Sequence, residues 1–117
     1  MTDIARRLTL EQMEEWARLT SDFNPMHLDP EFTRQTAYGR PIVFATLTLA
    51  IVAEALEREF GRQWTEGGVL DVRFVGPVMV GDEFAVSATT IDGSPSVECR
   101  TAGSAPLALA LNLAKQD

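Results

Sequence analysis

The chain has 117 residues, a length that fits one domain with a single hydrophobic core. Its formal net charge of −7 argues against a general nucleic-acid-binding surface, because such a surface needs a basic face. Cys99 is the only cysteine, so an intrachain disulfide and a multi-cysteine metal site are both excluded. We therefore expect a single cytoplasmic domain over residues 1–117, with no metal site.

Neither a signal peptide nor a membrane span is expected. The opening residues, Met1 to Arg7, lack the apolar core of a secretory signal. The longest mainly apolar run, Pro41 to Leu56, contains Thr46, Thr48 and Glu54 and is too short and polar to cross a bilayer. This run is typical of a buried helix.

A first helix is predicted from about Leu10 to Leu19. Thr9 and Gln12 have the spacing of a capping box, in which each side chain satisfies a free amide at the helix start. Leu10, Met13, Trp16 and either Ala17 or Leu19 recur at near-helical spacing, which indicates an amphipathic helix with Trp16 in the core.

Two further helices are predicted downstream. Pro30 is tolerated at a first helical position, so a short helix to about Gln35 is expected with Asp29 as its N-cap. A long helix is expected from about Phe44 to Phe60, with Gly61 as its stop. Its first half, residues 44–52, is apolar nearly all round, which predicts burial against a sheet.

The second half of the chain supplies four candidate strands. They are Val69–Val75, Glu83–Ile91, Ser96–Thr101 and Leu107–Leu113. Turn residues separate them, and Asp92-Gly93 is a hairpin signal. Helices followed by antiparallel strands predict an α+β fold.

The segment Asp22-Phe23-Asn24-Pro25-Met26-His27 carries the strongest chemical signal. It contains the only histidine, five residues after a carboxylate. Pro25 fixes its own φ and disfavours helix at Asn24, so we expect a defined bend instead of one helical face. Imidazole and carboxylate often exchange protons near neutral pH, and the bend can aim both at one water molecule. The alternative is structural, because Asp and Asn are ordinary turn residues.

Residues 21–56 resemble the MaoC-like (R)-specific enoyl-CoA hydratase family. Its signature has the form D-x-N-P-x-H-x-D, a short spacer, G-R-P-I-V and a long helix. Here the corresponding residues run from Asp22 to Asp29 and from Gly39 to Val43. The resemblance implies the hot-dog fold, in which a curved antiparallel sheet wraps around a long central helix. It also implies a homodimer with active sites at the interface.

The resemblance implies that Asp22 and His27 are the catalytic pair. The backbone N–H of Ala45, at the amino end of the central helix, is the candidate donor to the oxyanion. Three residues are candidate lining of the substrate pocket: Asn24, Pro41 and Phe44. The family usually has His-Gly after P-I-V, whereas this chain has Phe44-Ala45.

The leading functional hypothesis is a carbon–oxygen lyase. It would add water reversibly to a trans-2-enoyl thioester of CoA or acyl carrier protein, in fatty acid metabolism or polyketide biosynthesis, without a cofactor. One alternative is a hot-dog dehydratase, isomerase or cyclase that tailors a biosynthetic intermediate. Another is a non-catalytic hot-dog subunit of a heteromer. No nucleic-acid or membrane partner is expected.

Overall fold

The computed structural model describes residues 1–114, and within that range the chain forms five helices and five strands. The helices are α1 (Leu10–Thr20), α2 (Pro25–Leu28), α3 (Pro30–Arg34), α4 (Ala45–Phe60) and α5 (Arg62–Thr65). The strands are β1 (Thr2–Arg7), β2 (Val69–Phe74), β3 (Glu83–Ile91), β4 (Ser94–Arg100) and β5 (Leu107–Asn112). The predicted α+β class is confirmed.

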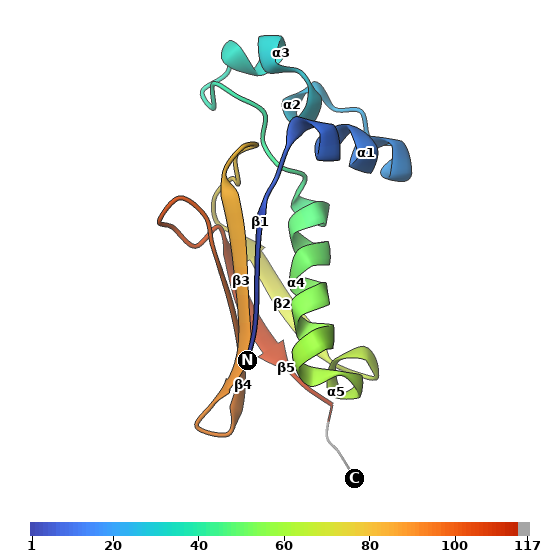
Figure 1. Ribbon diagram of the computed structural model, residues 1–117, viewed down its shortest axis with the longest axis vertical. Coiled ribbons are helices and arrows are strands. Elements are labelled where there is room, and N and C mark those ends of the chain that lie inside the picture. Colours follow the sequence, from blue (N-terminus) through green and yellow to red (C-terminus); the bar gives the residue numbers. More distant parts are fainter. Residues whose placement is uncertain (115–117) are drawn as a thin grey trace.

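All strand pairs are antiparallel. One sheet has the order β1-β3-β4, and β2 pairs with β5 in a second ladder. The elements β4 and β5 lie side by side, so the two ladders continue one another (Figure 1). Asp92 and Gly93 join β3 to β4 with φ angles of 50° and 78°, which is the tight hairpin that an Asp-Gly pair favours.

The core lies between the sheet and α4, which runs along β1 and β3 (Figure 1). Alternate side chains of β3 are buried, namely Phe84, Val86 and Ala88, as expected for a strand with one face on a core. They meet the buried face of α4, which includes Val52 and Leu56. This single layer of packing holds the helix whose amino end reaches the candidate site.

The first half of α4 lies against the sheet, as predicted, but the sheet does not cover all of its apolar surface. Thr48, Ile51 and Val52 are buried, but Ala45 and Ala50 are exposed. The reason is that the sheet covers only one side of the helix in this chain. None of the helices in residues 1–114 is long and apolar enough to cross a membrane.

Most predicted boundaries are within two residues of the observed ones, but β1 was not predicted. It reads Thr-Asp-Ile-Ala-Arg-Arg, and only Ile4 is buried, so the strand has almost no hydrophobic alternation. Its pairing with β3 defines it instead, from Thr2 opposite Ala88 to Arg7 opposite Glu83. The short helix α5 was also missed, since it directly follows the predicted helix stop at Gly61.

Candidate functional site

Helices α1, α2 and α3 lie together beyond one end of the sheet, above the amino end of α4 (Figure 1). The predicted capping box at the start of α1 is confirmed: Thr9 Oγ1 accepts the Gln12 amide at 3.2 Å, and Gln12 Oε1 accepts the Thr9 amide at 3.1 Å. Trp16 is half-buried, and its Nε1 donates to Thr46 Oγ1 at 3.0 Å. This bond ties α1 to the first turn of α4.

Asp22 lies in the exposed connection between α1 and α2. The chain leaves α1 through Ser21, whose φ of 57° is left-handed, and the amide of Asp22 still donates to Ala17 O at 3.2 Å. The Asp22 carboxylate accepts the amide of Asn24 at 3.2 Å. This Asx-turn leaves the remaining carboxylate lone pairs open to solvent.

The prediction of a bend instead of a helical face over residues 22–27 is wrong from residue 25 onwards, because residues 25–28 form the helical turn α2. Asn24 is its N-cap, with Oδ1 accepting the Met26 amide at 3.0 Å, and Pro25 occupies the favoured first position. Asn24 itself is extended, as predicted for a residue before proline. His27 therefore projects from a short capped helix, and the side chain of Asn24 has a structural role.

The His27 ring is anchored through one of its nitrogens. Nδ1 lies 2.7 Å from the backbone oxygen of Ile42. A carbonyl oxygen only accepts hydrogen bonds, so Nδ1 carries the proton in neutral His27 and Nε2 keeps its lone pair. This tautomer is the one in which Nε2 can take a proton.

Phe44 covers one face of that imidazole. The two ring centroids are 4.0 Å apart with an angle of 27° between the planes, and Phe44 is buried. Phe44 is also the N-cap residue of α4, where its side chain makes no capping hydrogen bond. Ala45 follows as the first helical residue, at a position where the backbone N–H has no intrahelical acceptor.

A cavity of about 330 Å³ opens beside these residues. Its lining is mostly apolar and consists of His27, Tyr38, Ile42, Val43, Ala45, Thr48, Phe74, Val75, Gly76, Pro77, Val78 and Leu107. Thr48 is buried, and its hydroxyl is already engaged with Ala45 O at 2.6 Å. His27 and Tyr38 therefore supply the other polar side chains of the wall.

The structure brings two predicted site residues, His27 and Ala45, to this cavity. Asp22, Asn24, Pro41 and Phe44 are not among its lining residues. Pro41 is buried, and its carbonyl accepts the Val80 amide at 2.9 Å. The sequence analysis missed the lining contributed by the end of β2 and the turn after it, because only the fold brings those residues to the start of α4.

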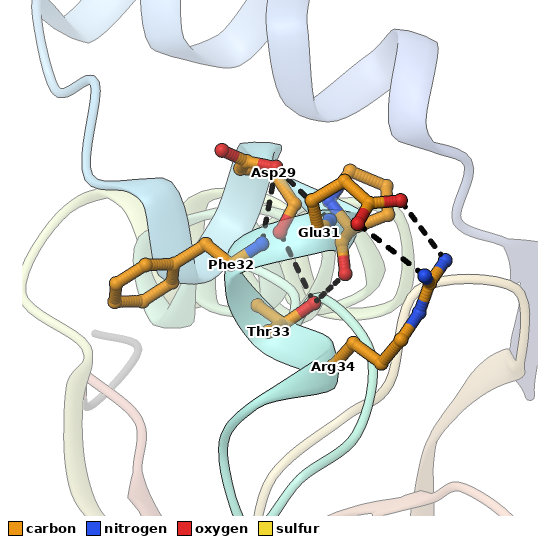
Figure 2. Close-up of polar contacts among 6 residues, drawn as sticks. Asp29, Glu31, Phe32, Thr33 and Arg34 are labelled. Carbon is orange, nitrogen blue, oxygen red and sulfur yellow. Dashed lines mark hydrogen bonds and ion pairs between the residues drawn. The ribbon is translucent and has the colours of Figure 1, made fainter.

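Asp29 has the structural role that was predicted for it. Its Oδ1 accepts the amides of Glu31 at 3.0 Å and Phe32 at 3.2 Å, which caps α3 (Figure 2). Arg34 pairs with Glu31 at 3.1 Å on the exposed side of the same turn. This local bonding accounts for Asp29 without a part in catalysis.

The model of the family described as "MaoC like domain" matches residues 2–102. The chain belongs to the MaoC-like domain family. The resemblance predicted from residues 21–56 is therefore confirmed. The MaoC-like match extends well beyond the motif segment and covers α4 and most of the strands.

Curated relatives of this MaoC-like chain include two named hydratases. It is 34% identical over 80 residues to the (R)-specific enoyl-CoA hydratase of Aeromonas caviae. That match covers 68% of this chain and 60% of the relative. It is 39% identical over 71 residues to the peroxisomal hydratase-dehydrogenase-epimerase of Saccharomyces cerevisiae, covering 61% of this chain and 7% of the relative. The matches thus span less than two thirds of either relative.

Solved structures share the fold. The (R)-hydratase of A. caviae has a TM-score of 0.73 at 26% identity, covering 92% of this chain and 88% of that one. An R-hydratase from Pseudomonas aeruginosa has a TM-score of 0.76 at 17% identity, covering 96% and 77%. The MaoC-like chain has the hot-dog fold, as predicted.

Proposed function

We propose that this MaoC-like protein catalyses the reversible addition of water to a trans-2-enoyl thioester. The observation that carries the proposal is one mainly apolar cavity whose wall includes His27, with Nε2 free, and Ala45 at the helix start. A conjugated thioester needs a proton acceptor near its β carbon and a donor near its carbonyl oxygen. The name of the A. caviae relative supports this reaction.

In the proposed reaction, His27 and Asp22 act as a pair on one water molecule. The pair takes one proton from the water as the water oxygen bonds to the β carbon, and the double-bond electrons move towards the carbonyl oxygen as an enolate. The α carbon then receives a proton back from the pair, which restores its starting state. Nε2 of His27 is the acceptor that its tautomer leaves available. Asp22 lies outside the cavity lining, so its proposed part is to hold the water from the solvent side.

The proposed oxyanion donor is the backbone N–H of Ala45. The amino end of a helix carries partial positive charge and unpaired amides, and both favour an enolate oxygen. Loss of one such donor typically costs about 3–4 kcal/mol of transition-state stabilisation. The methyl group of Ala45 narrows the path by which the thioester oxygen approaches this N–H, compared with the glycine that is usual in the family.

The decisive experiment assays purified protein with crotonyl-CoA, longer enoyl-CoA and 3-hydroxyacyl-CoA, following the enoyl absorbance and the stereochemistry of the product. We expect Asp22→Asn and His27→Ala each to lower kcat by at least roughly 10²-fold, since the first changes the carboxylate that holds the water and the second removes the group that accepts its proton. Asp71→Asn, an exposed carboxylate on β2, is the matched control and should stay active. Activity that survives both site substitutions would contradict the proposed pair.

A second candidate function is favoured by Phe44. Phe44 stacks on His27 and occupies the position where the family usually has another histidine. The proposed base therefore contacts an apolar ring in place of a polar one. A hot-dog dehydratase, isomerase or cyclase acting on a biosynthetic intermediate would fit this replacement. Conversion of 3-hydroxyacyl or cyclisable thioesters without hydration of crotonyl-CoA would favour this candidate, whereas ligand binding without turnover would indicate a non-catalytic subunit.

Three properties stay predictions: the carrier of the acyl substrate, the oligomeric state of the protein and its cellular compartment. Acyl-CoA and acyl-carrier-protein thioesters share the reacting atoms, so parallel assays with both carriers separate them. A homodimer is expected from the family resemblance, and the solution mass would distinguish it from a heteromer or a monomer. The cytoplasm remains the expected compartment.

A further inference from the structure

The extended segment Pro41–Val43 makes main-chain hydrogen bonds on both of its edges. On the first edge, Pro41 O accepts the Val80 amide at 2.9 Å, and the Val43 amide donates to Val78 O at 2.8 Å. These two bonds make an antiparallel bridge in which Ile42 lies opposite Met79. The segment is thus fastened to residues 78–80, which lead into β3.

The second edge holds the proposed base. The Ile42 amide donates to Met26 O at 3.0 Å, and the Ile42 carbonyl accepts from His27 Nδ1 at 2.7 Å. Both partners lie in the single turn of α2, which has no buried side chain of its own. The position and tautomer of His27 therefore depend on where residues 41–43 place one carbonyl oxygen.

Arg40 comes directly before residues 41–43 and ties them to the same neighbouring segment. Its Nη2 is 2.9 Å from Asp82 Oδ2, and its Nη1 donates to Val80 O at 3.2 Å. Asp82 itself is held in place, because its carbonyl accepts the amide of Leu8 at 3.3 Å and the neighbouring Gly81 amide donates to Leu8 O at 2.7 Å. Arg40 therefore joins residues 41–43 to a part of the chain that is anchored on Leu8, directly after β1.

We propose that Arg40 and Asp82 are positioning residues for His27. Their ion pair holds residues 41–43 in register on residues 78–80, so that the Ile42 carbonyl meets Nδ1 and Nε2 faces the cavity. Neither side chain lines the cavity or contacts His27, so their action is indirect. The kinetic part of this inference rests on the proposed function, whereas the part that concerns the imidazole does not.

The first test observes the imidazole directly. His27 is the only histidine, so the ¹⁵N resonances of the ring are assigned without ambiguity. We expect wild type at neutral pH to show the Nδ1–H tautomer, and Arg40→Met and Asp82→Asn to show a mixture of both neutral tautomers. Arg62→Met is the matched control, since it breaks the remote exposed pair with Glu66 and should leave the spectrum unchanged.

The second test measures turnover. Misplacing a reacting group by about 1 Å can cost up to roughly 10²-fold in rate, so we expect Arg40→Met to lower kcat by about tenfold. KM should change less than kcat, because Arg40 lies outside the cavity. Arg40→Lys keeps a positive charge facing Asp82 but loses the planar guanidinium that bonds two acceptors at once. We expect its kcat and its Nδ1–H signal to lie between those of wild type and Arg40→Met.

An unchanged ¹⁵N spectrum in folded Arg40→Met and Asp82→Asn would overturn the inference, and so would equal spectral changes in Arg62→Met. If Arg40→Met does not fold, Asp82→Asn and Arg40→Lys decide the question by the same measurement. Should wild type lack hydratase activity, the proposed function fails while the spectra still test the positioning role.

Discussion

At the scale of single residues, the environment assigns different roles to similar side chains. Asp22 and Asp29 stand seven positions apart and both accept backbone amides, yet Asp29 caps α3 with Oδ1 whereas Asp22 lies in an open turn before the histidine. His27 owes its tautomer to the Ile42 carbonyl, which lies 2.7 Å from Nδ1. Side-chain identity alone therefore does not determine which carboxylate or which ring nitrogen is available for chemistry.

Cys99 gives a prediction at this scale. Its thiol is buried on β4 and donates to Leu107 O at 3.6 Å. Burial, with a smaller contribution from the charge of Glu98, raises the thiol pKa above its usual value. Because the unfolded thiol ionises first, its contribution to stability is complete below the usual pKa and declines as the pH rises through the folded value.

We expect the native protein at pH 8 to react far more slowly with a thiol-specific disulfide reagent than the urea-unfolded chain does. The free energy of unfolding should also fall between pH 7.5 and pH 9.5, and this dependence should be weaker in Cys99→Ala. Fast labelling of the native protein would contradict the buried assignment.

At the scale of elements, the short helices form because of the residues that cap their ends. The turn α2 has four residues and no buried side chain, so Asn24 at its N-cap and Pro25 after it account for its formation. The longer α1 combines the Thr9 and Gln12 capping box with the buried side chains Met13 and Ala17. Leu19, which was an alternative member of its apolar face, is exposed.

The cap of α1 is testable. Thr9→Ala removes the oxygen that accepts the Gln12 amide, and we expect a loss of about 1 kcal/mol in the free energy of unfolding by urea. Thr9→Ser keeps a hydroxyl at the cap and should lose much less. Equal losses in both variants would mean that the threonine methyl, and not the hydrogen bond, stabilises this end.

At the scale of the whole molecule, the structure is more elongated than a compact domain with the same number of residues. Its extents are 53 × 29 × 20 Å, and its Cα radius of gyration is 15.4 Å. A compact domain of this length has a radius of roughly 13 Å. The helical region that extends beyond the sheet, from α1 to α3, includes His27 on α2 and Asp22 in the connection before it (Figure 1). The proposed chemistry therefore lies where the molecule projects from its core.

Glu54 links β1 to α4 and supplies a prediction about pH. Its Oε2 is 2.6 Å from Arg6 Nη2 and 2.7 Å from Arg58 Nη2. The hydrogen bond from Arg6, together with both positive charges, lowers the pKa of Glu54 although partial burial opposes this. A depressed folded-state pKa stabilises the fold above the usual carboxyl value, and this stabilisation is lost as the pH falls through the folded value.

We therefore expect Arg6→Met to lower the free energy of unfolding at pH 7 by roughly 0.5 kcal/mol, the usual scale of a partly exposed ion pair. The loss should shrink as the pH falls through the lowered folded-state pKa of Glu54, where the carboxylate becomes protonated. A double-mutant cycle with Glu54→Gln at pH 7 and pH 3.5 measures the coupling directly. A coupling that does not change with pH would contradict the assignment.

The α+β class, the long helix with its stop at Gly61, four of the strands and the segment that carries Asp22 and His27 were all predictable from sequence. These features depend on local rules: periodicity, caps, turn residues and the fixed φ of proline. The strand β1 was not predictable, because its identity comes from pairing with β3, more than 75 positions away. The same holds for the cavity, where Thr48 meets Val78 and Leu107 from distant parts of the chain.

The sequence by itself determined which residues are proposed to move a proton, since it contains one histidine and places it five residues after a carboxylate in a segment fixed by Pro25. Only the tertiary structure decided which ring nitrogen is free, which backbone amide shares its cavity and that Phe44 covers the imidazole. The physical reason is that these properties arise from main-chain hydrogen bonds and packing between segments that are distant in sequence, and no local pattern encodes them.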